Sequence, residues 1–233
     1  LDGNITNNAA YTDTQYGVIL NGTVKQQTIS GTGTYGRLEL NNSNGAVTGS
    51  NITLNKNLAL TNGILSIGDY KLSLGENSAI EGTGFGISKM ITTNGVFSDE
   101  GVNKVFGVVS GTLAKFVYPI GVSGKYTPID VTVDANTNTG TIRINCVNDS
   151  HPAVIDPTKV LHYYWSVEST GLTSFTGSLV FNYLDDDVIG TEADYYAARL
   201  TDNAWGFPGT VDATNNTLTY HFTGDDNLGD EYT

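Results

Sequence analysis

The sequence predicts an all-β protein with a repetitive first part and a second part built from longer strands. Gly is abundant at 28 residues, Tyr reaches 13, and Pro is scarce at 5. Together with many Thr and Asn residues, this composition favours strands and tight turns over helices. Apolar residues come in small groups separated by Asn, Gly and Asp, as in NLALTNGILSIGDYKLSLGEN at 57–77. This rhythm does not match the period of an amphipathic helix.

The first part repeats with a spacing of 20 residues. Three rows of apolar residues share this spacing: Val18–Leu20 with Leu38–Leu40 and Leu58–Leu60, Ile52–Leu54 with Leu72–Leu74, and Val47 with Ile67 and Ile87. Such a period, with short strands in each repeat, is typical of a parallel β-helix or a similar β-solenoid. Because alternate side chains of a strand point inward, we expect Leu58 and Leu60 to stack against Leu38 and Leu40.

The corners of these coils need residues that tolerate a positive φ. Gly, Asn and Asp supply this freedom at Asn44-Gly45, Asn62-Gly63, Gly68-Asp69 and Asn94-Gly95. Asn-Gly is also the strongest short signal for a β-hairpin. An antiparallel meander of short hairpins therefore remains an alternative to the solenoid.

The second part predicts an antiparallel β-sandwich of immunoglobulin-like size. Seven strand-like segments lie at 115–120, 126–134, 140–147, 161–169, 177–184, 195–201 and 217–223. Alternation is clear in Ile142, Ile144 and Cys146, and again in Tyr163, Trp165 and Val167. The single cysteine, Cys146, is expected to be a small buried hydrophobe. The segment 151–160 carries two Pro residues and predicts a crossover loop.

Charge separates the two parts. Residues 1–98 contain five Lys and Arg against six Asp and Glu, whereas residues 99–233 contain six against eighteen. We therefore predict a β-solenoid repeat region at 1–98 and a β-sandwich module at 99–233.

The formal net charge is −13, which makes nucleic acid and anionic membrane surfaces poor partners and favours cations. No apolar run approaches the roughly 18 residues of a membrane span. There is also no basic-then-apolar signal peptide at Leu1, so we expect a mature or excised piece of a protein.

Several motifs resemble those of repeat-rich secreted and cell-surface proteins of bacteroidetes, the adhesin-like cargo of the type nine secretion system. In the second part these are YPIG at 118–121 followed by YTP at 126–128, and HYYWSVESTG at 162–171 followed by the block at 178–205. In the first part they are QQTISGTGTYGRLELNN, ALTNGIL and YKLSLGENSAIEGTG.

The resemblance implies β-helix repeats followed by a β-sandwich module in a long extracellular protein. Such proteins usually end in a sorting domain, which is not found up to Thr233. The family's basic residue before Tyr-Trp is replaced here by Tyr163, beside His162.

Catalytic motifs are weak. GTGTYG at 31–36 fits a dinucleotide-binding pattern formally, but a strand and a turn follow it where a helix is required. His151, His162 and His221 form neither a spaced metal pair nor an obvious triad. A β-helix polysaccharide-degrading enzyme remains an alternative, although the first part offers few bases for clustered carboxylates.

The acidic stretch YLDDDVIGTEAD is the strongest polar group of residues. Carboxylates at this density can bind calcium, although the spacing is not that of an EF-hand. The candidate ligands are Asp185, Asp186, Asp187, Glu192 and Asp194. A second acidic cluster comprises Asp225, Asp226, Asp230 and Glu231. The alternative for both is a solvated loop in which Asp side chains cap turns.

These observations predict a non-catalytic extracellular structural segment of a surface adhesin, stalk or fibre. Its partners would be neighbouring modules of the same protein, or further copies joined end to end. The alternative is a carbohydrate-binding module that binds surface polysaccharide. Its candidate stacking platforms are Tyr163, Tyr195, Tyr196 and Trp205, although Trp165 and Trp205 are expected in the sandwich core. An ice-binding solenoid would need a single regular row of Thr, which the sequence lacks.

Overall fold

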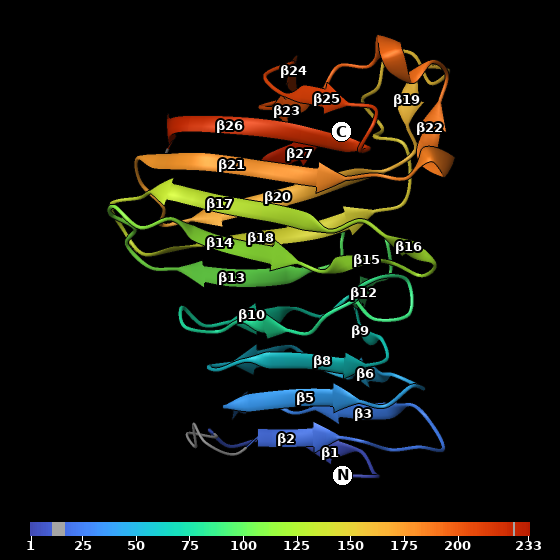
Figure 1. Cartoon of the computed structure of the whole chain (residues 1–233), viewed down its shortest axis with the longest axis vertical. Coiled ribbons are helices and arrows are strands. Elements are labelled where there is room, and N and C mark those ends of the chain that lie inside the picture. Colours follow the sequence, from blue (N-terminus) through green and yellow to red (C-terminus); the bar gives the residue numbers. More distant parts are fainter. Residues whose placement is uncertain (11–16, 226) are drawn as a thin grey trace. The chain divides into compact units, whose positions relative to one another are not determined.

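The computed structural model describes residues 1–10, 17–225 and 227–233. The structure is all-β, with 51% strand and 3% helix (Figure 1). Contacts divide the chain into two compact units. The first comprises residues 1–94, 98–105 and 119–126, and the second comprises residues 95–97, 106–118 and 127–233. Residues 99–105 and 119–126, which we expected in the second region, therefore belong to the first unit.

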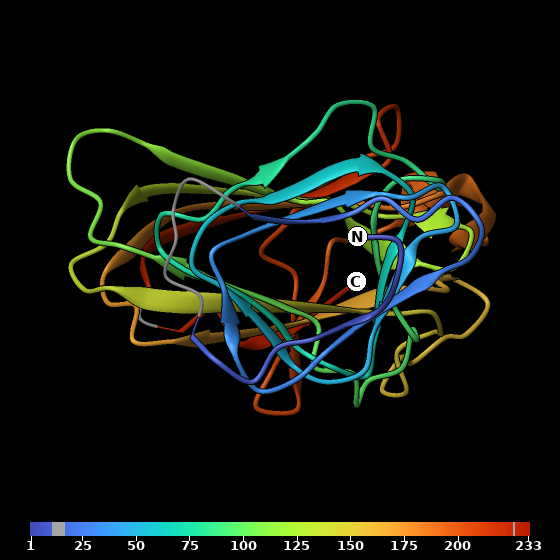
Figure 2. The same cartoon turned by 90° about the horizontal axis from the view of Figure 1, so that it is seen from below.

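The first unit is a β-solenoid of about four turns, built from three sheets whose coil-to-coil pairing is parallel. One sheet contains β1 (Ile5–Thr6), β3 (Gln27–Ser30), β6 (Ala46–Thr48), β9 (Leu65–Gly68), β12 (Ile91–Thr93) and β15 (Ile120–Val122), with β16 (Lys125–Tyr126) added antiparallel. A second contains β4 (Thr34–Tyr35), β7 (Ile52–Leu54), β10 (Leu72–Leu74) and β13 (Val102–Phe106). The third contains β2 (Gly17–Leu20), β5 (Arg37–Asn41), β8 (Leu58–Asn62) and β11 (Ile80–Glu81). Figure 2 looks along the stack, where the blue and teal coils overlie one another.

The register confirms two of the three predicted rows. Leu38 pairs with Leu58 and Leu40 pairs with Leu60, and all four side chains are buried. The second row is confirmed by the parallel pairing of β7 with β10. Because neighbouring strands of successive coils run parallel, the antiparallel meander is wrong for this unit.

The third predicted row is wrong. Val47 pairs with Ser66 rather than with Ile67, and the side chain of Ile87 is 63% exposed. Ile91 takes the inward place over Leu65 because the segment between β11 and β12 lengthens this coil. The spacing of 20 therefore holds for the central coils and fails where the chain inserts a loop.

Glycine forms the tight corners that the sequence predicts. Gly45 and Gly63 have φ angles of +75° and +92°. A Cβ atom on Gly63 would lie 2.0 Å from the backbone oxygen of Asn42 in the preceding coil. Such a position excludes any side chain, because both the backbone conformation and the space require glycine.

One buried cation lies inside the first unit. The Lys104 side chain donates hydrogen bonds to the backbone oxygens of Gly75, Glu76 and Val105 at 2.8, 2.7 and 2.6 Å. Burial lowers the pKa of Lys104 to about 8, and the nearby charge of Glu76 opposes that shift.

The second unit contains two larger antiparallel sheets. One contains β14 (Ala114–Tyr118), β17 (Ile129–Ala135), β21 (Phe175–Asn182), β26 (Thr217–Asp225) and β25 (Thr210–Asp212). The other contains β18 (Gly140–Val147), β20 (Tyr164–Thr170), β27 (Asp230–Tyr232), β23 (Arg199–Thr201) and β24 (Ala204–Gly206). A short pair, β19 (Val160–Leu161) with β22 (Val188–Ile189), and two 3₁₀ turns, η1 (Asp185–Asp187) and η2 (Glu192–Asp194), complete the unit.

Aromatic side chains from both sheets form the core of this unit. The ring of Phe181 lies 5.0 Å from Trp165, 5.1 Å from Tyr232 and 5.7 Å from Tyr220. All four side chains are buried, and burial raises the pKa of Tyr220 well above its ordinary value. Cys146 is also buried, as expected.

Candidate functional site

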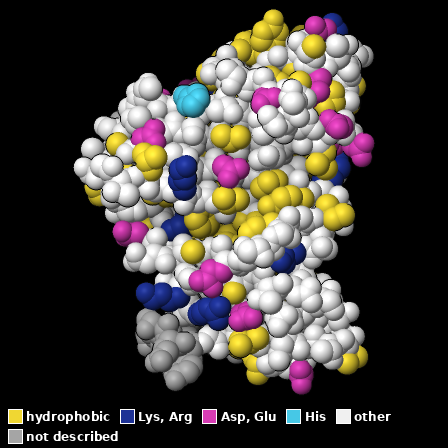
Figure 3. Space-filling view, viewed as in Figure 1, with side chains coloured by type: hydrophobic (Ala, Val, Ile, Leu, Met, Phe, Trp, Pro, Cys, Tyr) yellow, Lys and Arg dark blue, Asp and Glu magenta, His cyan; other side chains and the backbone are white. Residues whose placement is uncertain are grey.

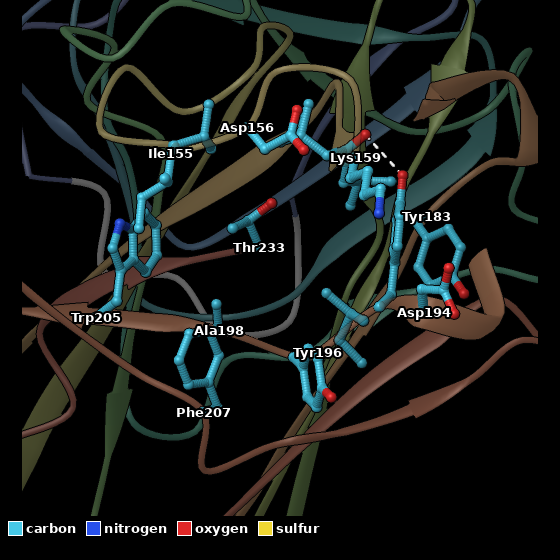
Figure 4. Close-up of a pocket in the computed structure, with 15 residues that line it drawn as sticks. Ile155, Asp156, Lys159, Tyr183, Asp194, Tyr196, Ala198, Trp205, Phe207 and Thr233 are labelled. Atoms are coloured by element: carbon cyan, nitrogen blue, oxygen red, sulfur yellow. Dashed lines mark hydrogen bonds between the residues drawn. The ribbon is translucent and has the colours of Figure 1, made fainter. Parts of the chain in front are cut away.

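A pocket of ≈ 210 Å³ lies within the second unit (Figure 4). Its walls come from three places: the crossover loop that contains Ile155, the segment that follows η2, and the chain around β24. Most of its lining is apolar, and several large side chains in it are exposed to solvent. This combination is typical of a small-molecule site and is uncommon on an inert surface.

Trp205 forms one wall and is held rigidly. It lies in a hairpin between β23 and β24, whose two turn residues Asp202 and Asn203 have positive φ angles of 50° and 61°. Its indole nitrogen donates a hydrogen bond of 2.9 Å to the backbone oxygen of Ala153. Its ring also packs edge-on against His151 at 4.9 Å. The indole is therefore fixed before any ligand arrives.

Three exposed side chains surround the mouth of the pocket. Ile155 is 92% exposed, Tyr196 76% and Phe207 62%. Tyr196 and Phe207 pack edge-to-face with their ring centroids 5.7 Å apart. In Figure 4, Trp205 and Ile155 lie on one side of the pocket, and Tyr196 and Phe207 lie below it.

Polar side chains lie across the pocket from Trp205. Lys159, Tyr183 and Asp194 occupy that side in Figure 4, with Asp156 at the top. The Asp156 carboxylate accepts hydrogen bonds from the hydroxyl and backbone amide of Thr158, and these bonds lower its pKa. Burial raises the pKa of Tyr183, and its hydroxyl donates to Glu192, which raises that pKa further.

Two of the four predicted stacking aromatics, Tyr196 and Trp205, line the pocket with an open ring surface. Tyr163 is fully buried, and its hydroxyl is 2.7 Å from the hydroxyl of Thr127. Tyr195 also lines the pocket, but its hydroxyl is hydrogen-bonded to the backbone at Val160 and Ile189 and has a structural role. Trp165 lies in the core as expected, whereas Trp205 is only half-buried.

Sequence reasoning missed Ile155 and Phe207. A signal for Phe207 was present, because it precedes Pro208, and a residue before proline is restricted to extended conformations. Such a residue often lies in an exposed turn. No comparable signal was available for Ile155.

The structure uses the carboxylates of the first acidic cluster separately. Asp185 accepts a hydrogen bond of 2.7 Å from the amide of Asn216, and Glu192 accepts one from Tyr183. Asp187 is buried, while Asp186 and Asp194 are exposed. Within the part of the chain that the structure describes, no three His, Cys, Asp or Glu side chains form a group suited to a metal ion.

The second acidic cluster is likewise distributed among different partners. Asp225 accepts from the backbone amide of Thr223 at 3.0 Å, and Glu231 is paired with His151. Asp230 forms an ion pair with Arg199, while burial raises the pKa of Asp230 and the guanidinium opposes that shift. Asp226 lies outside the described residues.

The remaining motifs have structural places. GTGTYG leads into β4 and β5 and forms a corner of the solenoid, as expected; a Cβ atom on Gly31 would lie 2.0 Å from the backbone oxygen of Asn7. Arg37 bridges Glu39 and Glu81 on the exposed face of the third sheet, at 3.2 and 3.3 Å. Ion pairs of this exposed kind contribute little to stability.

No family model, curated protein sequence or solved structure matches this chain. Among the described residues, no helix is long and apolar enough to cross a membrane. On the face in Figure 3, charged side chains are scattered among uncharged ones, so the net charge of −13 does not form a single patch there.

Proposed function

We propose that this chain is a non-catalytic extracellular structural segment of a surface adhesin, stalk or fibre. The observation that carries the proposal is the regular stacking of buried leucines from coil to coil, as between Leu38 and Leu58. The motifs that resemble bacteroidete type nine secretion cargo support the same assignment. Solenoids of this kind gain length by repetition, because each coil contacts only its neighbours.

The corners add to this argument. Glycines such as Gly63 let one coil approach the next so closely that no side chain fits between them. Backbone hydrogen bonds then run from coil to coil along all three sheets. A stem held by such ladders is suited to bearing load along its length.

We assign the second unit as a sandwich module of immunoglobulin-like type that terminates or links the solenoid. Support comes from its two antiparallel sheets and from the aromatic core centred on Phe181. In this arrangement the unit is a neighbouring partner for other modules of the same protein.

End-to-end assembly is part of the proposal. In the described part of the chain, β1, β2 and β4 are the first strands of the three solenoid sheets, and each pairs with another strand on one side only. Unpaired edges of this kind are templates for another chain. Light scattering over a range of concentrations tests this, since growing species support assembly and an unchanged monomer excludes it.

Surface exposure on the producing cells tests the main proposal. Brief protease treatment of intact cells should release fragments of this chain, because a stalk projects from the cell surface. A parallel assay incubates the purified chain with plant, algal and bacterial polysaccharides and measures new reducing ends. Release of reducing ends would favour the β-helix polysaccharide-degrading enzyme over the structural segment.

A carbohydrate-binding module is the second candidate, and the pocket beside Trp205 favours it. Stacking on aromatic rings is the common way in which proteins hold the apolar face of a sugar. Tyr196 and Phe207 add exposed aromatic surface at the same place. An adhesin segment and a carbohydrate-binding module are compatible, since an adhesin needs a recognition site.

A further inference from the structure

We propose that the pocket binds a single neutral pyranose ring, such as the terminal sugar of a surface glycan. This inference rests on the carbohydrate-binding candidate function and names its ligand class. It is carried by the size of the pocket, by the division of its walls into aromatic and polar sides, and by its charges.

The size of the pocket limits the ligand to one ring. Its volume of ≈ 210 Å³ is below the roughly 300–1,000 Å³ typical of sites for drug-sized ligands. A groove for an extended polysaccharide would be longer and would present several platforms in a row. A closed-off pocket instead selects the end of a chain.

The aromatic side of the pocket matches the apolar face of a pyranose. The Trp205 ring is fixed by its bond to Ala153 and by its contact with His151, so binding costs little side-chain entropy. Tyr196 and Phe207 brace one another in an edge-to-face contact. These rings provide fixed aromatic surface on two sides of the pocket, as Figure 4 shows.

The polar side matches the hydroxyl edge of the same ring. Asp156 and Asp194 offer carboxylate acceptors, and Lys159 offers an ammonium donor. Sugar hydroxyls both donate and accept, so one ring can use both kinds of partner. A lowered pKa keeps Asp156 ionised as an acceptor at neutral pH.

The charges of the pocket favour a neutral ligand over an ionic one. Two carboxylates, in a chain with a net charge of −13, repel uronic acids and other anionic sugars. A quaternary ammonium ligand would suit three aromatic rings. The ammonium of Lys159 in the same pocket opposes such a cation, and the polar wall would gain no hydrogen bonds from it.

Ligand-observed saturation-transfer NMR on the whole chain tests the proposal. The probes are the methyl glycosides of glucose, galactose, mannose and N-acetylglucosamine, together with methyl glucuronide and choline. We expect saturation of the ring C–H protons of at least one neutral glycoside, with a Kd of about 1 mM for a ligand of this size.

Two variants locate the binding. Tyr196→Ala removes an exposed ring and should weaken binding about 3- to 10-fold without unfolding the chain. Ile155→Asn changes the opposite rim and should weaken it less. Phe97→Ala is the matched control, because Phe97 is a 56% exposed aromatic residue that does not line the pocket, and it should bind as the unmodified chain does.

Each outcome separates the inference from the function on which it rests. Binding of a neutral glycoside that Tyr196→Ala weakens and Phe97→Ala does not supports the proposal. Binding of glucuronide alone would overturn the neutral ligand class and keep a carbohydrate-binding module. Binding of choline alone, or of no probe, would overturn the sugar site, whereas the structural role of the solenoid is tested independently by surface release.

Discussion

The two compact units bury their apolar side chains in different ways. The solenoid stacks aliphatic residues of successive coils, such as Leu40 on Leu60, and every coil repeats the same contact. The second unit brings aromatic residues of two antiparallel sheets together around Phe181. The first arrangement is suited to length, whereas the second leaves long connections free, and these connections form the pocket.

The largest expected effect compares the two cores directly. Phe181→Ala should lower the free energy of unfolding by about 3–5 kcal/mol and Leu60→Ala by about 2–5 kcal/mol, because each leaves a cavity at a fully buried position. Native-state hydrogen exchange should place the fastest new openings in β20, β21 and β26 for the first variant, and in β5 and β8 for the second. The same pattern of openings in both variants would contradict two separate cores.

The next effect concerns the corners of the solenoid. Gly63→Ala should cost about 3 kcal/mol or more, because it combines a positive φ with a Cβ position 2.0 Å from the Asn42 oxygen. Gly84→Ala is the matched control, since its φ is +64° and a Cβ atom there meets nothing within 4 Å. It should cost only about 1 kcal/mol. Equal losses in chemical denaturation of the two variants would show that coil-to-coil spacing is unimportant.

Lys104 gives the solenoid a pH dependence. Its folded pKa of about 8 lies below the ordinary value of 10.5, so the unfolded chain holds its proton to higher pH than the folded chain does. The contribution of Lys104 to stability therefore increases as the pH rises through about 8 toward 10.5.

Urea denaturation at several pH values checks this sign. The difference in unfolding free energy between the unmodified chain and Lys104→Met should shift in favour of the unmodified chain over that interval. A difference that stays constant, or one that shifts the other way, would contradict the account of this buried cation.

The smallest expected effect is that of removing calcium. Asp185 and Glu192 already accept hydrogen bonds from Asn216 and Tyr183. We therefore expect the melting temperature to be the same with calcium and with a chelator. A clear decrease in the presence of the chelator would restore the calcium site that the acidic sequence suggested.

The comparison also explains how much the sequence could predict. The solenoid was accessible because its contacts repeat at one spacing, so that Leu38 and Leu58 identify each other. That reasoning failed at Ile87, because a lengthened coil moves the register without leaving a local signal.

In the second unit, alternation identified buried positions such as Ile144 and Trp165. The pocket depends instead on contacts between distant segments, as when Trp205 bonds to the backbone of Ala153. Periodicity carries no information about such contacts. For this reason Trp205 was expected in the core, and Ile155 was not expected in a site at all.

Immunogold electron microscopy of intact producing cells, with antibodies raised against this chain, tests the central proposal most directly. A structural segment of a surface adhesin, stalk or fibre predicts gold particles on thin projections outside the cell envelope. Labelling confined to the cell interior, with none on the surface, would contradict it.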